Sequence, residues 1–278
     1  MKSSFPRSGN RFAAAALAAV IAGAAFSAPM VKEGDRIGFL GDSITQFGNG
    51  PSGYVNLVMK GLRICGVKAE KVPAGISGNK SNNMLARLER DVLSKNVTWM
   101  TLSCGVNDVW HRERGVELEE YKKNISQILD KCAAAGVKVV VLTSTMITED
   151  AANQLNAKLD GYNAWLKEEA GRRGLPVADL NADMKAELAR IRETDKTPGN
   201  KLTRDGVHMA FPGDCMMAGG VLRAMGVDES RKDEILAAWR DMPGAYRVQV
   251  DLTANEYERL KASGKRAVDI IRSAIEQK

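Results

Sequence analysis

The sequence predicts an α/β protein with a flavodoxin-like, three-layer α/β/α arrangement around a five-stranded parallel sheet. Short apolar segments alternate with longer amphipathic segments along most of the 278 residues, which is typical of a parallel sheet covered by helices on both faces. Polar residues gather directly after the predicted strands, where ligands of such sheets bind. With 44% apolar and 27% charged residues, the composition is that of a globular protein and argues against disorder.

The first 27 residues are predicted to be a secretory signal peptide. Basic Lys2, Arg7 and Arg11 precede an apolar run over residues 12–26, and small side chains surround its end, which is the layout of an export signal. An uncleaved N-terminal anchor is the alternative, although the run is short for a membrane span. We therefore expect an exported protein, periplasmic or extracellular, without stable insertion in a membrane.

Residues 28–240 are predicted to form one α/β domain, and residues 241–278 to form an extension that packs on it. The extension reads as a strand over 246–252 followed by helices near 254–275. Half of the formal charge of +6 belongs to the first 27 residues, and no dense cluster of Lys and Arg follows, so no nucleic-acid partner is expected. The oligomeric state is left open.

Five short apolar runs are predicted as strands because turn residues bound them. They span residues 36–40, 69–72, 98–103, 138–143 and 176–179. Helices are expected near 53–65, 81–95, 118–135 and 155–173, and near 213–225 and 229–240. The helix near 118–135 has the clearest pattern, because Tyr121, Ile125 and Ile128 recur at three- and four-residue spacing. Gly136 is expected to end it.

The cysteines Cys65, Cys104, Cys132 and Cys215 leave two interpretations open. Export permits disulfides. However, Cys104 ends an apolar strand and Cys132 lies on the apolar face of a helix, which is typical of buried free thiols. The four lack the paired spacing of a zinc or redox site, and the chain contains two histidines, so neither a metal nor a cofactor is expected.

Ser43 is the candidate nucleophile. It follows the first predicted strand in Gly41-Asp42-Ser43, where a glycine lets the chain turn tightly and leaves the next side chains at the rim of the sheet. A serine that caps a helix is the ordinary alternative. The assignment therefore requires a base and hydrogen-bond donors close to the hydroxyl.

His208 is the candidate general base. It ends the turn Asp205-Gly206-Val207-His208, in which Asp205 can place its carboxylate against the imidazole. Such a contact fixes the tautomer of the ring and stabilises the imidazolium that forms when a serine loses its proton.

Gly78 and Asn107 are candidate donors to a tetrahedral oxyanion. Gly78 lacks a Cβ, so its backbone N–H can approach a ligand closely, and Asn107 follows the third predicted strand and carries an amide. Turn formation is the alternative for both residues.

These segments together resemble the SGNH hydrolase family, also called GDSL esterases and lipases. The matching blocks are Gly41-Asp42-Ser43, Ile76-Ser77-Gly78, Gly105-Val106-Asn107-Asp108 and Asp205-Gly206-Val207-His208. The resemblance spans roughly residues 36–225. It implies Ser43 as nucleophile, His208 as base, Asp205 as its orienter, and an oxyanion hole made by the N–H groups of Ser43 and Gly78 and the side chain of Asn107.

The chain departs from the family pattern at two places. Asn79-Lys80-Ser81 stands where an Asp-Thr pair often follows the glycine, and Met209 stands where proline is frequent after the last histidine. Both departures can alter the fit of a substrate, and neither removes one of the implied catalytic groups.

Asp42, Trp110 and His111 are candidate substrate contacts beside these blocks. Trp110 is placed to stack on a sugar. The alternatives are a surface-loop histidine for His111 and a turn stabiliser or helix N-terminal acid for Asp42.

The segment 48–53 matches the glycine pattern of a dinucleotide loop, but it lies away from the strand end and contains Pro51. We interpret it as a flexible loop at the rim of the site. A Gly-x-Ser-x-Gly elbow is absent from the sequence, which disfavours the α/β-hydrolase form of the triad.

The resemblance and the export signal predict a serine esterase that hydrolyses O-acyl esters, above all O-acetyl groups on extracellular carbohydrate, through a Ser-His-Asp triad and an acyl-enzyme. The expected partner is a small ester or an acetylated carbohydrate. The alternatives are a lipase or lysophospholipase type of esterase and a non-catalytic carbohydrate-binding relative. A nucleotide-binding oxidoreductase agrees poorly with export.

Overall fold

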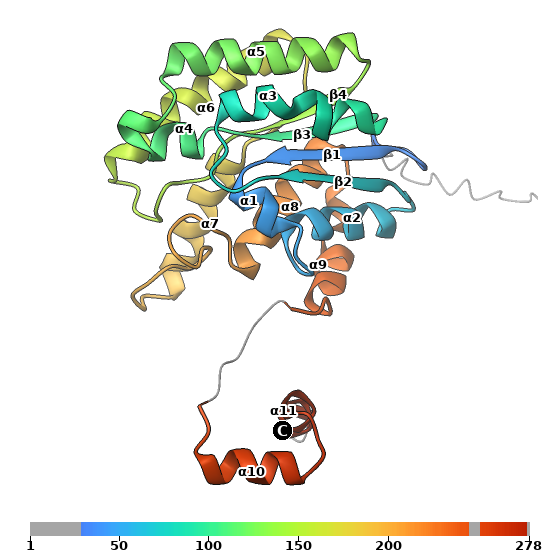
Figure 1. The fold of residues 1–278 in the computed structure, drawn as a ribbon, viewed down its shortest axis with the longest axis vertical. Coiled ribbons are helices and arrows are strands. Elements are labelled where there is room, and N and C mark those ends of the chain that lie inside the picture. Colours follow the sequence, from blue (N-terminus) through green and yellow to red (C-terminus); the bar gives the residue numbers. More distant parts are fainter. Residues whose placement is uncertain (1–28, 245–250, 277–278) are drawn as a thin grey trace, which may run out of the picture.

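Five parallel strands form one sheet in the order β2-β1-β3-β4-β5 in the computed structural model, which describes residues 29–244 and 251–276 (Figure 1). The strands are β1 (Arg36–Gly41), β2 (Glu70–Gly75), β3 (Trp99–Ser103), β4 (Lys138–Leu142) and β5 (Val177–Ala178). This is the flavodoxin-like strand order, and the predicted fold class is confirmed.

Helices cover both faces of the sheet. One layer contains α3 (Ser81–Asp91), α5 (Leu118–Ala134) and α6 (Gln154–Arg172), and the other contains α2 (Tyr54–Ile64), α7 (Leu180–Thr194), α8 (Phe211–Ala224) and α9 (Lys232–Arg240) (Figure 1). Two short helices, α1 (Ser43–Gly48) and α4 (Val106–Trp110), follow β1 and β3 directly. Short 3₁₀ turns occupy Leu93–Lys95, Arg112–Arg114 and Glu229–Arg231.

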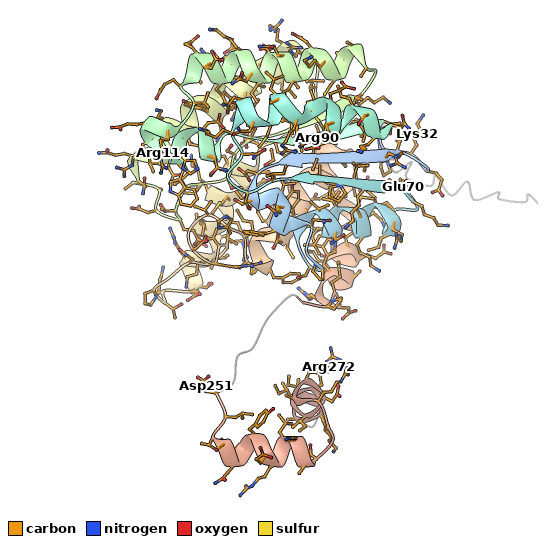
Figure 2. All side chains as sticks on the ribbon, viewed as in Figure 1. Lys32, Glu70, Arg90, Arg114, Asp251 and Arg272 are labelled. Carbon is orange, nitrogen blue, oxygen red and sulfur yellow. The ribbon has the colours of Figure 1, made fainter. Side chains whose placement is uncertain are left out.

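The core lies between the sheet and its two helical layers, where side chains fill the space (Figure 2). Every residue of β3 is buried, because a central parallel strand is covered on both faces. Helix α5 buries Tyr121, Ile125 and Ile128 as its sequence pattern predicts, and it exposes Glu119 and Glu120. The central strands are therefore packed on both faces, and this packing fixes where the segments that follow them begin.

Several elements differ from the sequence-based expectation, among them the short helices α1 and α4, which the sequence did not predict. Helix α7 was not expected; Asp179 caps it by accepting a hydrogen bond from the Ala182 N–H, and Leu180, Met184 and Leu188 are buried four residues apart. Strand β2 runs on through Pro73, which an edge strand tolerates because proline lacks only the N–H donor.

All four cysteines are free thiols, with Cys104 and Cys132 buried and Cys65 and Cys215 partly buried. Of the two interpretations that the sequence left open, the structure therefore favours free thiols over disulfides. Burial raises the pKa of the Cys132 thiol to about 12, so the thiolate is strongly disfavoured there.

The C-terminal extension contains α10 (Ala254–Ala262) and α11 (Ala267–Glu276), where helices were expected. Figure 1 draws both apart from the domain, and apart from the half-buried Leu260 and Ile271 the side chains over 251–275 are exposed. Met242, near the start of the extension, packs against the domain core, but the expected packing has no support over α10 and α11. The strand expected over 246–252 falls largely outside them, as does the signal peptide.

Across the two described ranges, no helix is both long enough and apolar enough to span a membrane.

Asp214 on α8 is a buried carboxylate that faces the start of α2. Its Oδ1 accepts a hydrogen bond from the Tyr54 N–H at 2.9 Å. Burial raises the pKa of Asp214 from 3.8 to about 7, although the Tyr54 N–H favours the charged form. The folded protein therefore keeps this proton up to about pH 7, whereas the unfolded chain releases it near 3.8. Stability is lost as the pH rises between these two values.

We expect Asp214→Asn to remove this loss, because asparagine is neutral at every pH and keeps an oxygen for the Tyr54 N–H. The gain in melting temperature over the wild type should be larger at pH 8 than at pH 5 by roughly 5 °C, which corresponds to about 2 kcal/mol. Thermal unfolding at both pH values checks this. Asp251→Asn, at an exposed carboxylate outside the domain (Figure 2), is the control. A pH-independent difference for Asp214→Asn would contradict the prediction.

Candidate active site

Ser43 is the first residue of α1, directly after β1. Asp42 caps this helix, because its Oδ1 accepts a hydrogen bond from the Ile44 N–H at 2.9 Å. Gly41 must be a glycine, since a Cβ there would overlap the Thr45 side chain. The turn from strand to helix thus presents the Ser43 hydroxyl at the carboxyl edge of the sheet, where β1 and β3 flank the point at which the strand order reverses.

Ser43, His208 and Asp205 form one hydrogen-bonded chain. The Ser43 Oγ lies 2.8 Å from His208 Nε2, and His208 Nδ1 lies 2.7 Å from Asp205 Oδ2. The other carboxylate oxygen of Asp205 accepts the backbone N–H groups of His208 and Val207. The three residues that the sequence singled out for this contact therefore meet in space, although 165 positions separate the serine from the histidine.

The charge of Asp205 is well stabilised. Burial opposes its ionisation, but the hydrogen bonds from the His208 ring and from the backbone outweigh burial and lower the pKa of Asp205 to about 2. Asp205 is therefore a carboxylate at any physiological pH. A carboxylate beside Nδ1 favours the proton on that nitrogen and leaves Nε2 free to accept one from Ser43.

A buried glutamate that sequence reasoning missed holds the loop that carries Asp205 and His208. The Glu149 carboxylate accepts the backbone N–H groups of Lys201, Leu202 and Thr203 and the Thr203 hydroxyl, at 2.7 to 2.8 Å. Thr203 then pairs with Met209 across the turn. The His208 imidazole therefore lies on an anchored loop, and this anchoring limits the positions that the ring can reach.

The candidate oxyanion donors lie after the neighbouring strands. Gly78 has a φ of +75° and open space where a Cβ would stand, and its N–H has no recorded acceptor among the described residues. The buried Asn107 amide donates to the Asn79 carbonyl at 3.1 Å and to Asp42 Oδ2 at 3.3 Å. An incoming oxyanion would compete with the longer of these two bonds.

Asp42 is buried beneath the site. Burial raises the pKa of Asp42 to about 6, although the Ile44 N–H favours the charged form, and the nearby Asp108 raises it further. Both of its oxygens accept hydrogen bonds within the protein. This geometry favours the turn-stabilising interpretation of Asp42 over a direct substrate contact.

Aromatic side chains lie on α1 and α4, the two short helices that follow β1 and β3. Trp110, at the end of α4, is 39% exposed and stacks on His111 with ring centroids 6.2 Å apart. Phe47, which sequence reasoning missed, is 48% exposed and meets the His208 ring edge-on at 5.1 Å. The sequence could have indicated Phe47 because it lies four residues after Ser43, on the same short helix.

The glycine-rich segment 48–53 is tied down instead of free. The Asn56 amide donates to the Asn49 and Gly50 carbonyls, and the Lys71 ammonium donates to the Asn49 side chain at 2.7 Å. The segment is therefore held by side chains of α2 and β2, which the sequence did not indicate.

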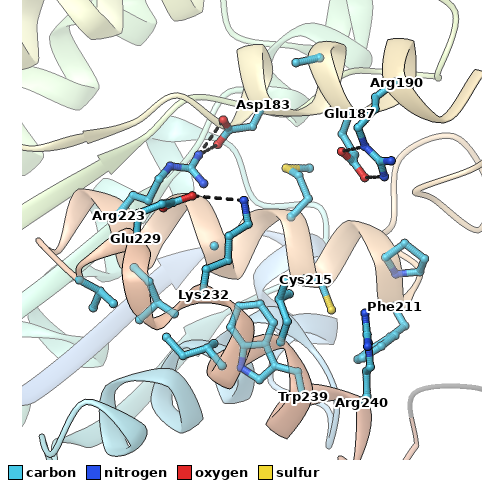
Figure 3. Close-up of a pocket in the computed structure, with 18 of the residues that line it drawn as sticks. Asp183, Glu187, Arg190, Phe211, Cys215, Arg223, Glu229, Lys232, Trp239 and Arg240 are labelled. Atoms are coloured by element: carbon cyan, nitrogen blue, oxygen red, sulfur yellow. Dashed lines mark hydrogen bonds and ion pairs between the residues drawn. The ribbon is translucent and has the colours of Figure 1, made fainter. Parts of the chain in front are cut away.

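A cavity of about 730 Å³ lies between α7, α8 and α9, and neither Ser43 nor His208 lines it (Figure 3). Charged groups on its wall pair with one another, as Arg223 does with Asp183 at 2.6 Å and Lys232 with Glu229 at 3.2 Å. Within the described part of the chain, no group of three or more His, Cys, Asp or Glu side chains is placed to hold a metal ion.

Residues 39–210, most of the domain, match the model of the GDSL-like lipase/acylhydrolase family. The chain belongs to this family. GDSL-like hydrolases of this type cleave carboxylic esters, and this protein is an esterase. The family assignment agrees with the resemblance seen in the four sequence blocks.

Relatives of this GDSL-like hydrolase include an acetylxylan esterase of Geobacillus stearothermophilus, 25% identical over 220 residues, which cover 71% of this chain and 97% of the relative. Among solved structures, the acetyl xylan esterase AlAXEase is similar with a TM-score of 0.63 and 32% identity over 68% of this chain and 98% of that one. LAE5, an α/β hydrolase from the metagenome of Lake Arreo in Spain, has a TM-score of 0.63 and 25% identity over 71% of this chain and 98% of its own.

Proposed function

We propose that this GDSL-like hydrolase removes O-acetyl groups from carbohydrate by serine catalysis. The observation that carries the proposal is the chain of hydrogen bonds from the Ser43 hydroxyl through His208 to Asp205, at 2.8 and 2.7 Å. Its similarity to two acetylxylan esterases supports the choice of substrate class. The same geometry argues against a non-catalytic carbohydrate-binding relative, because such a protein has no need of an aligned base.

In the proposed reaction, His208 Nε2 takes the proton of Ser43 while Oγ attacks the ester carbonyl. The N–H groups of Ser43 and Gly78 and the Asn107 amide stabilise the tetrahedral oxyanion, and Asp205 stabilises the imidazolium. The bond between the carbonyl carbon and the sugar oxygen then breaks, His208 gives its proton to that oxygen to form the sugar hydroxyl, and an acetyl-enzyme remains. Water, deprotonated by His208, then attacks that ester, and acetate leaves as Ser43 recovers its proton.

The rim of the site suits a sugar. Trp110 exposes a flat aromatic face, of the kind that packs against the apolar side of a pyranose ring. Phe47 stands beside the His208 ring, where it can limit the room for an acyl group. Export through residues 1–27, to the periplasm or beyond, remains part of this proposal and would bring the enzyme to extracellular polysaccharide.

Acetate release from acetylated xylan tests the proposal. We expect release from the polymer or its oligosaccharides, and hydrolysis of p-nitrophenyl acetate at least about tenfold faster than of a p-nitrophenyl ester with a long acyl chain, because a small acyl site rejects extra methylenes. The purified full-length protein is incubated with each substrate, and acetate or p-nitrophenol is measured. A faster rate on the long-chain ester, or no acetate from any acetylated carbohydrate, would overturn the assignment in favour of a lipase type of esterase.

A further inference from the structure

Arg87 on α3 is a buried cation that the proposed reaction does not use. Its side chain is 6% exposed, and its guanidinium points at the ends of two strands. Nη2 donates to the Gly41 carbonyl and Nη1 to the Ala74 carbonyl, each at 2.8 Å, and Nε donates to the Asn79 side-chain oxygen at 2.6 Å. Asp91, one turn along the helix, partly balances the charge at 3.1 Å.

The groups that accept these hydrogen bonds adjoin the three candidate oxyanion donors. Gly41 lies two residues before Ser43 at the end of β1, and Asn79 directly follows Gly78. The backbone carbonyl of Asn79 in turn accepts the Asn107 amide at 3.1 Å. The Arg87 side chain therefore contacts the segments of Ser43 and Gly78 directly, and it reaches Asn107 through Asn79.

We propose that Arg87 is the positioning residue of the oxyanion hole, which sets the spacing of the Ser43 N–H, the Gly78 N–H and the Asn107 amide. The inference rests on the proposed function and adds a residue that the reaction scheme does not contain. Arg87 does not itself touch the substrate. It acts through the carbonyls that end β1 and β2 and through Asn79.

Arginine suits this role for a physical reason. The planar guanidinium holds its donors in a rigid fork, so it can fix two carbonyls and an amide oxygen at set separations. A lysine carries its charge on one atom and cannot span the same three acceptors. Without the guanidinium, the Gly41 carbonyl keeps the Ile76 N–H at 3.1 Å, but the fork that holds the strand ends and the Asn79 side chain at set distances is lost.

The expected effect follows from how an oxyanion hole works. Donors stabilise the transition state only if they are already aligned, and a misplacement of about 1 Å costs roughly 100-fold in rate. The ground-state ester depends less on this alignment. We therefore expect Arg87→Lys to lower kcat on p-nitrophenyl acetate by about 10- to 100-fold while KM changes by less than about threefold.

The control is Arg90→Gln. Arg90, labelled in Figure 2, lies on the same helix and donates to the same Asp91, at 2.6 Å, but its side chain is 72% exposed, and its recorded side-chain hydrogen bonds in the described part of the chain go to Asp91 alone. We expect kcat to stay within about twofold of the wild type for this variant. The full-length proteins are compared by kcat, KM and melting temperature, and a phosphonate probe counts the active sites so that kcat refers to folded enzyme.

Asn79 supplies a second test if Arg87→Lys fails to fold. Asn79→Ala removes the acceptor of the Arg87 Nε but leaves the backbone carbonyl that holds Asn107, and Asn79→Asp restores an acceptor oxygen. We expect kcat for each labelled site to fall by about 10-fold in Asn79→Ala. We expect Asn79→Asp to retain a larger fraction of the wild-type kcat than Asn79→Ala does.

The outcomes separate the two proposals. If Ser43→Ala abolishes phosphonate labelling but kcat for each labelled site in Arg87→Lys equals that of Arg90→Gln, the role of Arg87 is overturned and the proposed function stands. If Arg87→Lys does not fold, an undiminished kcat in Asn79→Ala likewise overturns the role of Arg87 and leaves the proposed function standing. Labelling that persists in Ser43→Ala overturns the proposed function and the role of Arg87 with it. A lower kcat for each site, with KM nearly unchanged, supports the inference.

Discussion

Ser43→Ala is expected to lower kcat/KM on p-nitrophenyl acetate by about 10⁴-fold or more, because alanine offers no atom to attack the carbonyl. The fold should remain. The recorded side-chain hydrogen bond of Ser43 joins it to His208, and Asp42, not Ser43, caps α1. We expect the melting temperature to change by no more than about 2 °C.

A fluorophosphonate probe locates the nucleophile directly. The wild type should be labelled on Ser43, as mapped by mass spectrometry of the digested protein, and Ser43→Ala should not be labelled. The matched control is Ser94→Ala, at an exposed serine whose hydroxyl donates to the Arg90 carbonyl. Equal labelling of Ser43→Ala and Ser94→Ala would place the nucleophile elsewhere.

Asp205→Asn is expected to lower kcat by about 10³- to 10⁴-fold. An asparagine can turn its amide toward His208 Nδ1 and donate to it, which favours the tautomer with the proton on Nε2. That tautomer cannot accept the Ser43 proton. The asparagine oxygen can still accept the backbone N–H groups of Val207 and His208, so the turn should persist.

The contribution of the Asp205 contact to stability depends on pH with a defined sign. Because hydrogen bonds lower the pKa of Asp205 to about 2, below its ordinary value of 3.8, the contact stabilises the fold above that ordinary value and is lost as the pH falls toward 2. The loss of kcat in Asp205→Asn should therefore persist at both pH 6 and pH 9, because Asp205 of the wild type is charged at both values. Asp228→Asn is the control, because Asp228 accepts a backbone N–H from Ser230 in a similar turn but faces no imidazole. A loss smaller than tenfold in Asp205→Asn would contradict the role of the carboxylate.

The strands and the blocks at their ends were predictable because they leave local signals. Buried parallel strands are short apolar runs, and the polar residues after them mark one edge of the sheet. Ser43 and His208 could be paired because the chain contains two histidines and because the blocks that contain Ser43 and His208 resemble those of the family. Their separation of 2.8 Å is a property of the folded chain that the motifs alone do not give.

Arg87, Glu149 and Phe47 could not be found in this way. Glu149 binds mainly backbone N–H groups, and Arg87 binds two backbone carbonyls, one of them at Gly41, 46 positions away. Backbone groups have no sequence signature. Phe47 reads as one more apolar residue of a helix. Helix α7 was missed because alanines and charged residues obscure its narrow apolar stripe.

The long separation between Ser43 and His208 also bears on when the enzyme can act during its synthesis. Gly78 and Asn107 emerge from the ribosome soon after Ser43, whereas the imidazole and the carboxylate that orients it come only after residue 204. Any nascent or truncated chain that stops short of that loop carries a nucleophile without its base. Under the proposed mechanism, ester cleavage is thus withheld until the domain is nearly complete.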